Sequence, residues 1–278
     1  MVRIVSDTST LYSTAQAREA GFAVSPLSVH IADKSYREFD EISAEEFVAL
    51  INQGNMPTSS QPAIGEVAAL YDEFSQDEVL NIAMAAGLSG TYSGAVAAAE
   101  LSGNPQNVTV LNSRTLCGPH RYLVENAVKM AGEGHSLREI VERTEELMNT
   151  AKSYLIPADF AYLRRGGRLS PLVSYVGQFT HLAPVMTQTE DGTQLTVAGV
   201  RPSFLHAIKY VIKALHSRGV GEGWRIYISH GAAAHLAEKA HKLLSAVFPA
   251  ATFEILPLSP AFITQGGPEC VAVQVIRN

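Results

Sequence analysis

The sequence lacks the features that mark secreted and membrane-spanning proteins. Its only two cysteines, Cys117 and Cys270, lie far apart in the chain of 278 residues. They do not form a disulfide framework and suit a reducing cytosol. No apolar run reaches the roughly 20 residues of a membrane-spanning helix, and the opening "MVRIVSDTSTL" becomes polar too early for a signal peptide. We therefore expect a cytoplasmic protein without stable membrane insertion.

Motifs for nucleic acids, nucleotides and metals are also missing. The net charge of −6 argues against a nucleic-acid binder, which needs a basic surface to replace counterions. Walker-type and Rossmann glycine motifs are absent. The pair Cys117 and His120 has no partners at zinc-ligand spacing. We therefore expect no nucleic-acid partner, no metal and no cofactor.

The first half of the chain predicts a parallel sheet covered by helices. Apolar, strand-like runs at residues 2–5, 79–85 and 108–113 alternate with helical patterns. Ser43 and Ser136 each precede a helical pattern and have a glutamate three residues further on, which predicts a capping box. Another apolar segment is interrupted at Pro26, which indicates an edge strand or a strand that breaks.

The second half of the chain shows a different pattern of predicted helices and strands. An apolar helix is predicted over residues 171–180, and two alternating runs over 183–200 are joined by the hairpin signal Asp191-Gly192. Further strands are expected near residues 224–230 and 252–258, around a helix at 234–248. The sequence thus predicts a two-domain α/β protein. Residues 1–155 would form an α/β domain with a parallel sheet, and residues 156–278 an α+β domain with a partly antiparallel sheet.

Two hydroxyl-rich loops of the N-terminal half are candidates for anion binding. "PTSSQPA" contains Ser59 and Ser60, and "GLSGTYSGA" contains Ser89 and Gly90; each precedes a predicted helix. A helix N-terminus presents unpaired N–H groups and a positive dipole end, and nearby hydroxyls add donors. The alternative for each loop is a tight turn with an ordinary serine cap.

The segment "YLRRGGR" adds a third candidate. Arg164, Arg165 and Arg168 surround a glycine pair, and arginine suits forked recognition of a carboxylate or phosphate. The alternative is a solvated basic turn. Ser89 also lies in a near match to the nucleophile motif G-x-S-x-G, with Thr91 where that motif has glycine. A serine-dependent hydrolase or acyltransferase is therefore an alternative function.

The ordered set of motifs resembles the DegV family. It consists of "SDTSTL", "PTSSQPA", "GLSGTYSGA", "YLRRGGRLS", the hairpin followed by "VRPSFLHAI", and "TQGGPE", which together span essentially the whole chain. Members of this family are bacterial fatty-acid-binding proteins that serve as the lipid-carrying subunit of fatty acid kinase. The resemblance implies a long-chain fatty acid in a buried apolar tunnel and no catalysis by this chain itself. A separate ATP-dependent kinase subunit would make the acyl phosphate. A lipid-sensing regulatory protein is a further alternative.

The resemblance also implies site residues. Ser59, Ser89 and Arg168 would hold the carboxylate, and the remaining candidates for that site are Ser60, Gly90 and Gln265. Within the first loop, Ser60 is expected mainly to cap the following helix. Arg201 would face the kinase partner. The family's C-terminal H-x-G-P-G signature reads here from Gln265 to Glu269, and a glutamine can donate a hydrogen bond but cannot carry charge.

Overall fold

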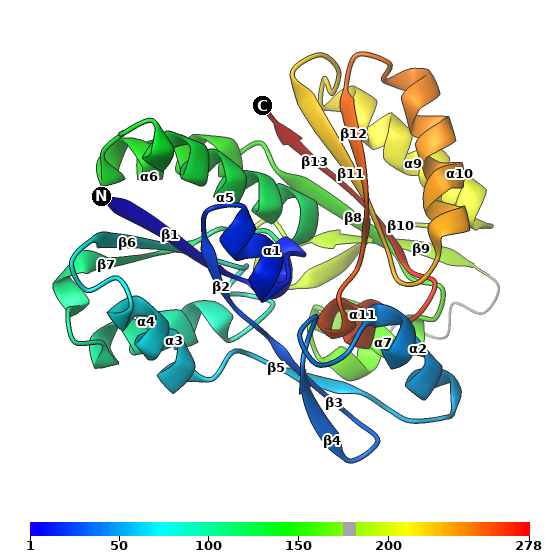
Figure 1. The fold of residues 1–278 in the computed structure, drawn as a ribbon. Coiled ribbons are helices and arrows are strands. Elements are labelled where there is room, and N and C mark those ends of the chain that lie inside the picture. The colour runs from blue at the N-terminus through cyan, green and yellow to red at the C-terminus, as the bar shows by residue number, and fades with distance from the viewer. Residues whose placement is uncertain (175–181) are drawn as a thin grey trace.

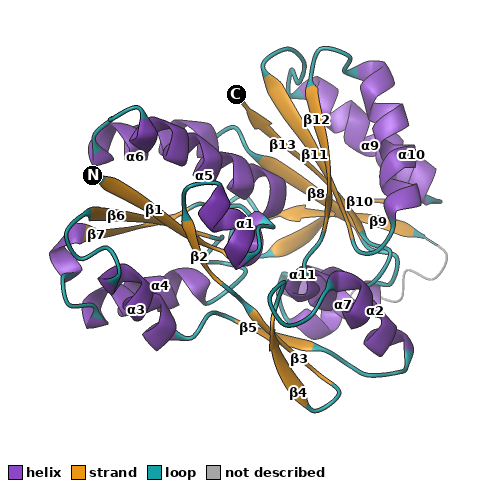
Figure 2. Ribbon diagram, in the orientation of Figure 1, coloured by secondary structure: helices purple, strands orange, loops and turns teal. Residues whose placement is uncertain are grey.

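Three β-sheets organise the structure, a computed structural model that describes residues 1–174 and 182–278 (Figures 1 and 2). The first sheet contains the strands β1 (Val2–Asp7), β2 (Ala23–Ser25), β6 (Glu78–Ala83) and β7 (Val108–Asn112). They are all parallel and lie in the order β2-β1-β6-β7. Side chains alternate between its faces, so that Ile4 joins one apolar cluster and Val5 another.

Helices cover both faces of this parallel sheet. The helical elements of the first half are α1 (Thr14–Glu19), α2 (Ala44–Asn52), α3 (Ile64–Asp72), α4 (Thr91–Leu101), α5 (Cys117–Gly132) and α6 (Leu137–Met148), with the 3-10 turns η1 (Thr8–Thr10) and η2 (Pro105–Asn107). Figure 1 shows α5 and α6 on one face and α3 and α4 on the other. The capping boxes predicted at Ser43 and Ser136 are both present. The predicted parallel, helix-covered sheet is confirmed.

The second sheet is mixed, as predicted for the C-terminal half. Its strands are β8 (Lys152–Ile156), β9 (Ala183–Gln188), β10 (Leu195–Arg201), β11 (Trp224–His230), β12 (Thr252–Pro257) and β13 (Val271–Arg277). They lie in the order β10-β9-β8-β13-β11-β12, and among these neighbours β11 and β12 are parallel while the others are antiparallel. The predicted hairpin is the pair β9 and β10. Helices α9 (Phe204–Ser217) and α10 (Ala234–Val247) pack on one face of the sheet.

The predicted apolar helix over 171–180 is described only at its start. Helix α8 (Pro171–Ser174) forms there, and residues 175–181 lie outside the described part of the chain.

The third sheet was not expected. It is antiparallel, has the order β4-β3-β5, and consists of β3 (Ser28–Ile31), β4 (Lys34–Arg37) and β5 (Thr58–Ser60). Pro26 separates it from β2, so the predicted break at this proline sends the chain from one sheet into another. The C-terminal helix α11 (Pro260–Gly266) contacts β3, β5, α2 and α7 (Phe160–Gly166) (Figure 1). Residues of the N-terminal half therefore pack directly against a C-terminal helix.

The predicted boundary between residues 155 and 156 stays a prediction. Strand β8 crosses it, and the whole of β8 belongs to the six-stranded sheet through its pairing with β13 and β9.

The prediction that Ser60 caps the following helix is wrong. Ser60 lies in β5 and pairs with Ser28 of β3. The N-cap of α3 is Ala63, which makes no side-chain capping bond. Ser60 precedes that N-cap by three residues. The hydroxyl-rich segment thus forms an edge strand of the third sheet and not the start of a helix.

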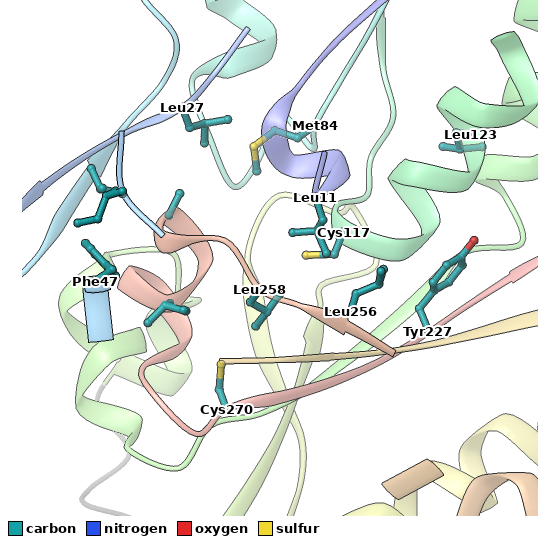
Figure 3. Close-up of a cluster of buried hydrophobic side chains, with 14 of the residues drawn as sticks. Leu11, Leu27, Phe47, Met84, Cys117, Leu123, Tyr227, Leu256, Leu258 and Cys270 are labelled. Carbon is teal, nitrogen blue, oxygen red and sulfur yellow. The ribbon is translucent and has the colours of Figure 1, made fainter. Parts of the chain in front are cut away.

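One apolar cluster joins the two halves of the chain (Figure 3). It includes Met84 and Cys117 beside the parallel sheet, and Leu258 and Cys270 from the C-terminal segment. Close approach of α5 to the second sheet depends on Gly118. A Cβ atom added at Gly118 would lie 2.1 Å from Cγ of the buried Tyr227 in β11, so a larger residue cannot enter without displacing that ring.

Gly118→Ala is expected to destabilise the protein by about 1–3 kcal/mol, because the added methyl overpacks the contact with the Tyr227 ring. Urea unfolding followed by circular dichroism measures this change. The matched control is Gly132→Ala at the end of the same helix, where a Cβ atom would meet nothing within 4 Å. Alanine favours the helical conformation more than glycine does, so the free energy of unfolding of Gly132→Ala should be unchanged or raised by about 0.5–1 kcal/mol. Equal unfolding midpoints for the two variants would contradict this account of Gly118.

Candidate functional site

A pocket lies where the three sheets meet. Elements of both halves line it, and the space between its lining atoms, with the open mouth counted, is about 1040 Å³. Most of the lining is apolar and consists of Leu27, Met84, Leu88, Leu116, Cys117, Leu155, Leu163, Met186, Leu195, Leu258, Ala261, Phe262, Cys270 and Ala272.

Part of this lining is one face of the six-stranded sheet. Leu155 pairs in register with Met186 on one side and with Ala272 on the other, so three neighbouring strands present a row of apolar side chains. The alternate residues Val271 and Val273 point to the opposite face, where they pack with α9 and α10. The pleat of the sheet thus separates a pocket face from a core face.

Next to this apolar row lies a glutamine whose polar atoms are already engaged. Gln274 Nε2 donates to the carbonyl oxygen of Leu116 at 2.9 Å and to Ser153 Oγ at 2.9 Å, and its Oε1 accepts from Gly118 N at 3.3 Å. Gln274 therefore ties the sheet to the start of α5 and has little hydrogen-bonding capacity left for a ligand.

Ser59 and Gln265 meet at a polar part of the pocket. Gln265 Nε2 donates to Ser59 Oγ at 3.1 Å, although the two residues are 206 positions apart in the sequence. Gly166 makes room for this glutamine, because a Cβ atom at residue 166 would lie 2.1 Å from Gln265 Oε1. Ser60 lines the pocket too, but its Oγ lies 3.4 Å from His30 Nε2. Successive residues of a strand point to opposite faces, so Ser59 and Ser60 are oriented differently.

Ser89 and Gly90 occupy the turn before α4. Ser89 Oγ accepts from Thr91 N at 3.2 Å and lies 2.8 Å from Thr91 Oγ1. Ser89 lines the pocket, whereas Gly90 is the N-cap of α4 and is absent from the described lining. A Cβ atom at Gly90 would lie 2.0 Å from Gln61 Oε1, so this glycine admits the glutamine side chain. Gln61 lines the pocket and was not predicted as a site residue, although it lies within the motif "PTSSQPA".

Of the three predicted arginines, Arg168 reaches the pocket. Its Nε donates to the carbonyl oxygen of Leu88 at 3.2 Å, and its Nη1 donates to the carbonyl oxygen of Gly166. A guanidinium has five N–H groups, so three remain for a ligand. Arg164 and Arg165 are exposed, and Arg165 lies over the ring of Tyr162. Arg168 thus ties the loop at Leu88 to the end of α7 and supplies positive charge.

The described lining is otherwise uncharged. Apart from Arg168 it contains no lysine, aspartate or glutamate, and it contains no histidine. Burial raises the pKa of the Cys270 thiol to about 12 and also raises the pKa of Cys117. Both thiols therefore stay protonated at neutral pH and belong to the apolar surface of the pocket.

A histidine partner for Ser89 is missing from the described lining. His120 is buried elsewhere, with Nδ1 at 2.6 Å from Ser9 Oγ and Nε2 at 2.9 Å from the carbonyl oxygen of Ile82. Burial lowers its pKa and favours the neutral ring. The described lining thus offers Ser89 no base of the kind a serine nucleophile requires.

Arg201 lies outside the described lining of the pocket. It ends β10, where Nη1 donates to the carbonyl oxygen of Val200 at 2.7 Å and the guanidinium lies 4.2 Å from the ring centre of Tyr210. At the C-terminal signature, Glu269 has φ +60°, in the left-handed region that favours glycine, and its N–H donates to the carbonyl oxygen of Gly231 at 2.7 Å. A glutamate thus takes a left-handed conformation at the position where the family signature has glycine.

The described residues hold neither a membrane-spanning helix nor a cluster of metal ligands. Residues 1–174 and 182–278 contain no helix whose length and apolar character would allow it to cross a bilayer. Over the same ranges, no three or more histidine, cysteine, aspartate or glutamate side chains are grouped so that they could hold a metal ion.

Comparisons with known proteins agree on one family. The model of the DegV family, described as uncharacterised, matches residues 1–278. The DegV domain-containing protein SA1258 of Staphylococcus aureus (strain N315) is 28% identical over 278 residues, which is 99% of this chain and 98% of the relative. The crystal structure of DegV, a fatty acid binding protein from Bacillus subtilis, has 25% identity and a TM-score of 0.88, covering 100% of this chain and 99% of that one. A DegV family protein from Eubacterium eligens loaded with heptadecanoic acid shares the fold, with 17% identity and a TM-score of 0.86 over 100% of both chains.

Proposed function

Because this chain belongs to the DegV family, we propose that it binds a long-chain fatty acid in the pocket between its three sheets. The single observation that carries the proposal is the division of the pocket into an apolar face and a polar cluster. The acyl chain would lie along Leu155, Met186 and Ala272. The carboxylate would lie among Ser59, Ser89 and Arg168. The fatty acid binding protein from Bacillus subtilis, at 25% identity, supports this choice of ligand.

Elementary energetics favours such a ligand. Each buried methylene contributes roughly 0.8 kcal/mol, so a long acyl chain supplies ample affinity. A buried carboxylate, by contrast, is costly unless it is paired and hydrogen-bonded. The hydroxyls of Ser59 and Ser89 and the free N–H groups of Arg168 are the donors that would offset this cost. Gly90 and Gln265 would support them, since Gly90 admits Gln61 and Gln265 donates to Ser59, whereas the Ser60 hydroxyl lies beside His30.

Protein purified under native conditions is expected to carry fatty acid. Organic extraction followed by mass spectrometry should recover about one long-chain acid per chain, and delipidated protein should take up added oleate, measured by calorimetry. A short acid such as butyrate is the matched control and should bind far more weakly, because it buries few methylenes. Delipidated, folded protein that takes up no oleate would overturn the proposal.

Ser59→Ala and Ser89→Ala are each expected to weaken oleate binding by about 1–3 kcal/mol, because each removes a donor from a buried carboxylate. Titration of delipidated protein measures the change. Ser60→Ala is the matched comparison, since it alters the neighbouring residue whose hydroxyl lies beside His30. Its affinity should stay within about twofold of the original. A loss in Ser60→Ala equal to that in Ser59→Ala would indicate a general disturbance of β5 rather than a carboxylate contact of Ser59.

We further propose that the chain catalyses no reaction itself and presents its fatty acid to a separate ATP-dependent kinase subunit. The lining supports this, because apart from Arg168 the described pocket residues include no charged side chain and no histidine. Arg201 would contribute to docking from its place outside the pocket. A lipid-sensing regulator would use the same pocket without phosphoryl transfer.

Arg201→Ala is expected to abolish co-purification of a kinase subunit and ATP-dependent acyl phosphate formation, while oleate affinity is unchanged. Affinity capture from the organism of origin and an assay with labelled ATP measure the two effects. Lys239→Ala, which removes an exposed positive charge from α10, is the control. Capture of a partner without any acyl phosphate would favour the sensing role.

A further inference from the structure

A buried glutamate lies outside the pocket but contacts one of its walls. Glu38 directly follows β4 and is fully buried, with 0% of its surface exposed. Thr8 Oγ1 donates to Glu38 Oε1, and Ala261 N donates to Glu38 Oε2 at 2.9 Å. The Thr8 hydroxyl also accepts from Leu27 N at 3.0 Å. The carboxylate thus links the end of β1, the start of the third sheet and the first turn of α11.

Helix α11 is held against the third sheet at both of its ends. In its first turn, Ala261 N bonds to Glu38, which follows β4. In its last turn, Gln265 bonds to Ser59 in β5. Between these two bonds, Ala261 and Phe262 line the pocket. Both bonds thus join α11 to the third sheet or to the turn beside it. A shift of the first turn of α11 away from Glu38 would therefore also move Gln265 in its last turn.

We propose that Glu38 is a positioning residue of the pocket, which holds α11 so that Gln265 meets Ser59 and Phe262 closes the wall. This inference rests on the proposed function for its effect on a ligand, but its effect on α11 is independent of any ligand. A helix of seven residues has little stability of its own. Its position must therefore come from tertiary contacts, and the Glu38 bond is a contact at its otherwise unpaired N–H groups.

The backbone next to Glu38 supports this role. Phe39 has φ +67°, a left-handed conformation that is unfavourable for a residue with a bulky side chain. Glu38 N also donates to the carbonyl oxygen of Leu27 at 3.0 Å, which fixes the turn. Strain of this kind persists only where surrounding contacts hold it in place. Here it accompanies the inward orientation of the carboxylate.

The charge of Glu38 gives the proposal a specific signature. Burial, with a smaller contribution from the nearby Asp7, raises its pKa from an ordinary value of 4.5 to about 7, although hydrogen bonds from Thr8, Ser259 and the Ala261 backbone lower it. Cys117 is the other titratable group that faces it, and its thiol stays neutral. Ala261 and the rest of α11 carry no ionisable side chain. Within the described residues, no ion pair compensates Glu38.

The sign of the pH dependence follows from this raised pKa. Opening of α11 would expose Glu38 to water and return its pKa toward 4.5. The open state then binds fewer protons than the closed state between these two values. Rising pH therefore favours opening from about pH 5 to about pH 7, and the effect levels off above the folded pKa.

Amide hydrogen exchange of α11 tests the proposal without a ligand. Glu38→Gln keeps an acceptor for Ala261 N but removes the charge, so α11 should stay protected and lose its pH dependence. At each pH, the exchange rate of α11 in the original protein is divided by its rate in Glu38→Gln. This ratio should rise at least tenfold between pH 5.5 and pH 7.5. Glu38→Ala, which removes the acceptor, should speed exchange of α11 at every pH. Glu73→Gln, which removes an exposed carboxylate at the end of α3, should match the original protein.

Oleate titration of the same delipidated proteins gives the second readout. Oleate affinity of the original protein should fall over this pH interval relative to Glu38→Gln, by no more than the factor measured for α11 exchange, because oleate binds the closed state. The proposal is overturned if Glu38→Gln keeps the original pH profile of α11 exchange, or if folded Glu38→Ala protects α11 normally. Absence of oleate binding in every protein would instead refute the proposed function, and the exchange data would still decide the role of Glu38.

Discussion

The pocket depends on how a helix of seven residues is held between two sheets. Helix α11 is too short to be stable by itself, so its contacts determine where it lies. Its first turn bonds to Glu38 and its last turn bonds to Ser59. Both partners belong to the three-stranded sheet or its flanking turn, while α11 also lines the pocket. The antiparallel sheet is therefore a support for the pocket wall as much as an element of the fold.

Close backbone approaches complete the enclosure on the other side. Gly118 allows α5 to reach the Tyr227 ring, and a Cβ atom at Gly87 would lie 2.1 Å from the Cα atom of Thr193, near the tip of the hairpin. These glycines bring the carboxyl ends of the parallel strands onto the face of the second sheet. Ligands of open α/β sheets commonly bind outside those strand ends. The site thus follows from the packing of two sheets and is completed by the third.

Much of the fold could be predicted because its signals are local. Alternation of strands and helices, the Asp191-Gly192 turn, the break at Pro26 and the two serine caps each depend on a few neighbouring residues. The contact between Ser59 and Gln265 joins residues 206 positions apart, and the third sheet pairs residues 28–30 with residues 58–60, so no local pattern reveals either. Ser60 was misjudged because its strand pairing with β3 outweighs its preference for a helix start. Glutamines such as Gln61 carry no periodic signal at all.

Several polar groups near the pocket already have hydrogen-bond partners within the protein, and this favours one orientation of a ligand. Gln274 uses its amide to join the sheet to α5, so the surface beside the apolar row offers a ligand little polar attraction. Arg168 has two N–H groups engaged by backbone carbonyls and keeps others free. Among the described lining residues, Arg168 and the serines offer a negative charge a guanidinium and hydroxyl donors. An amphiphile can therefore satisfy both parts of the pocket in one orientation, with its charged end at Arg168 and its chain along Leu155.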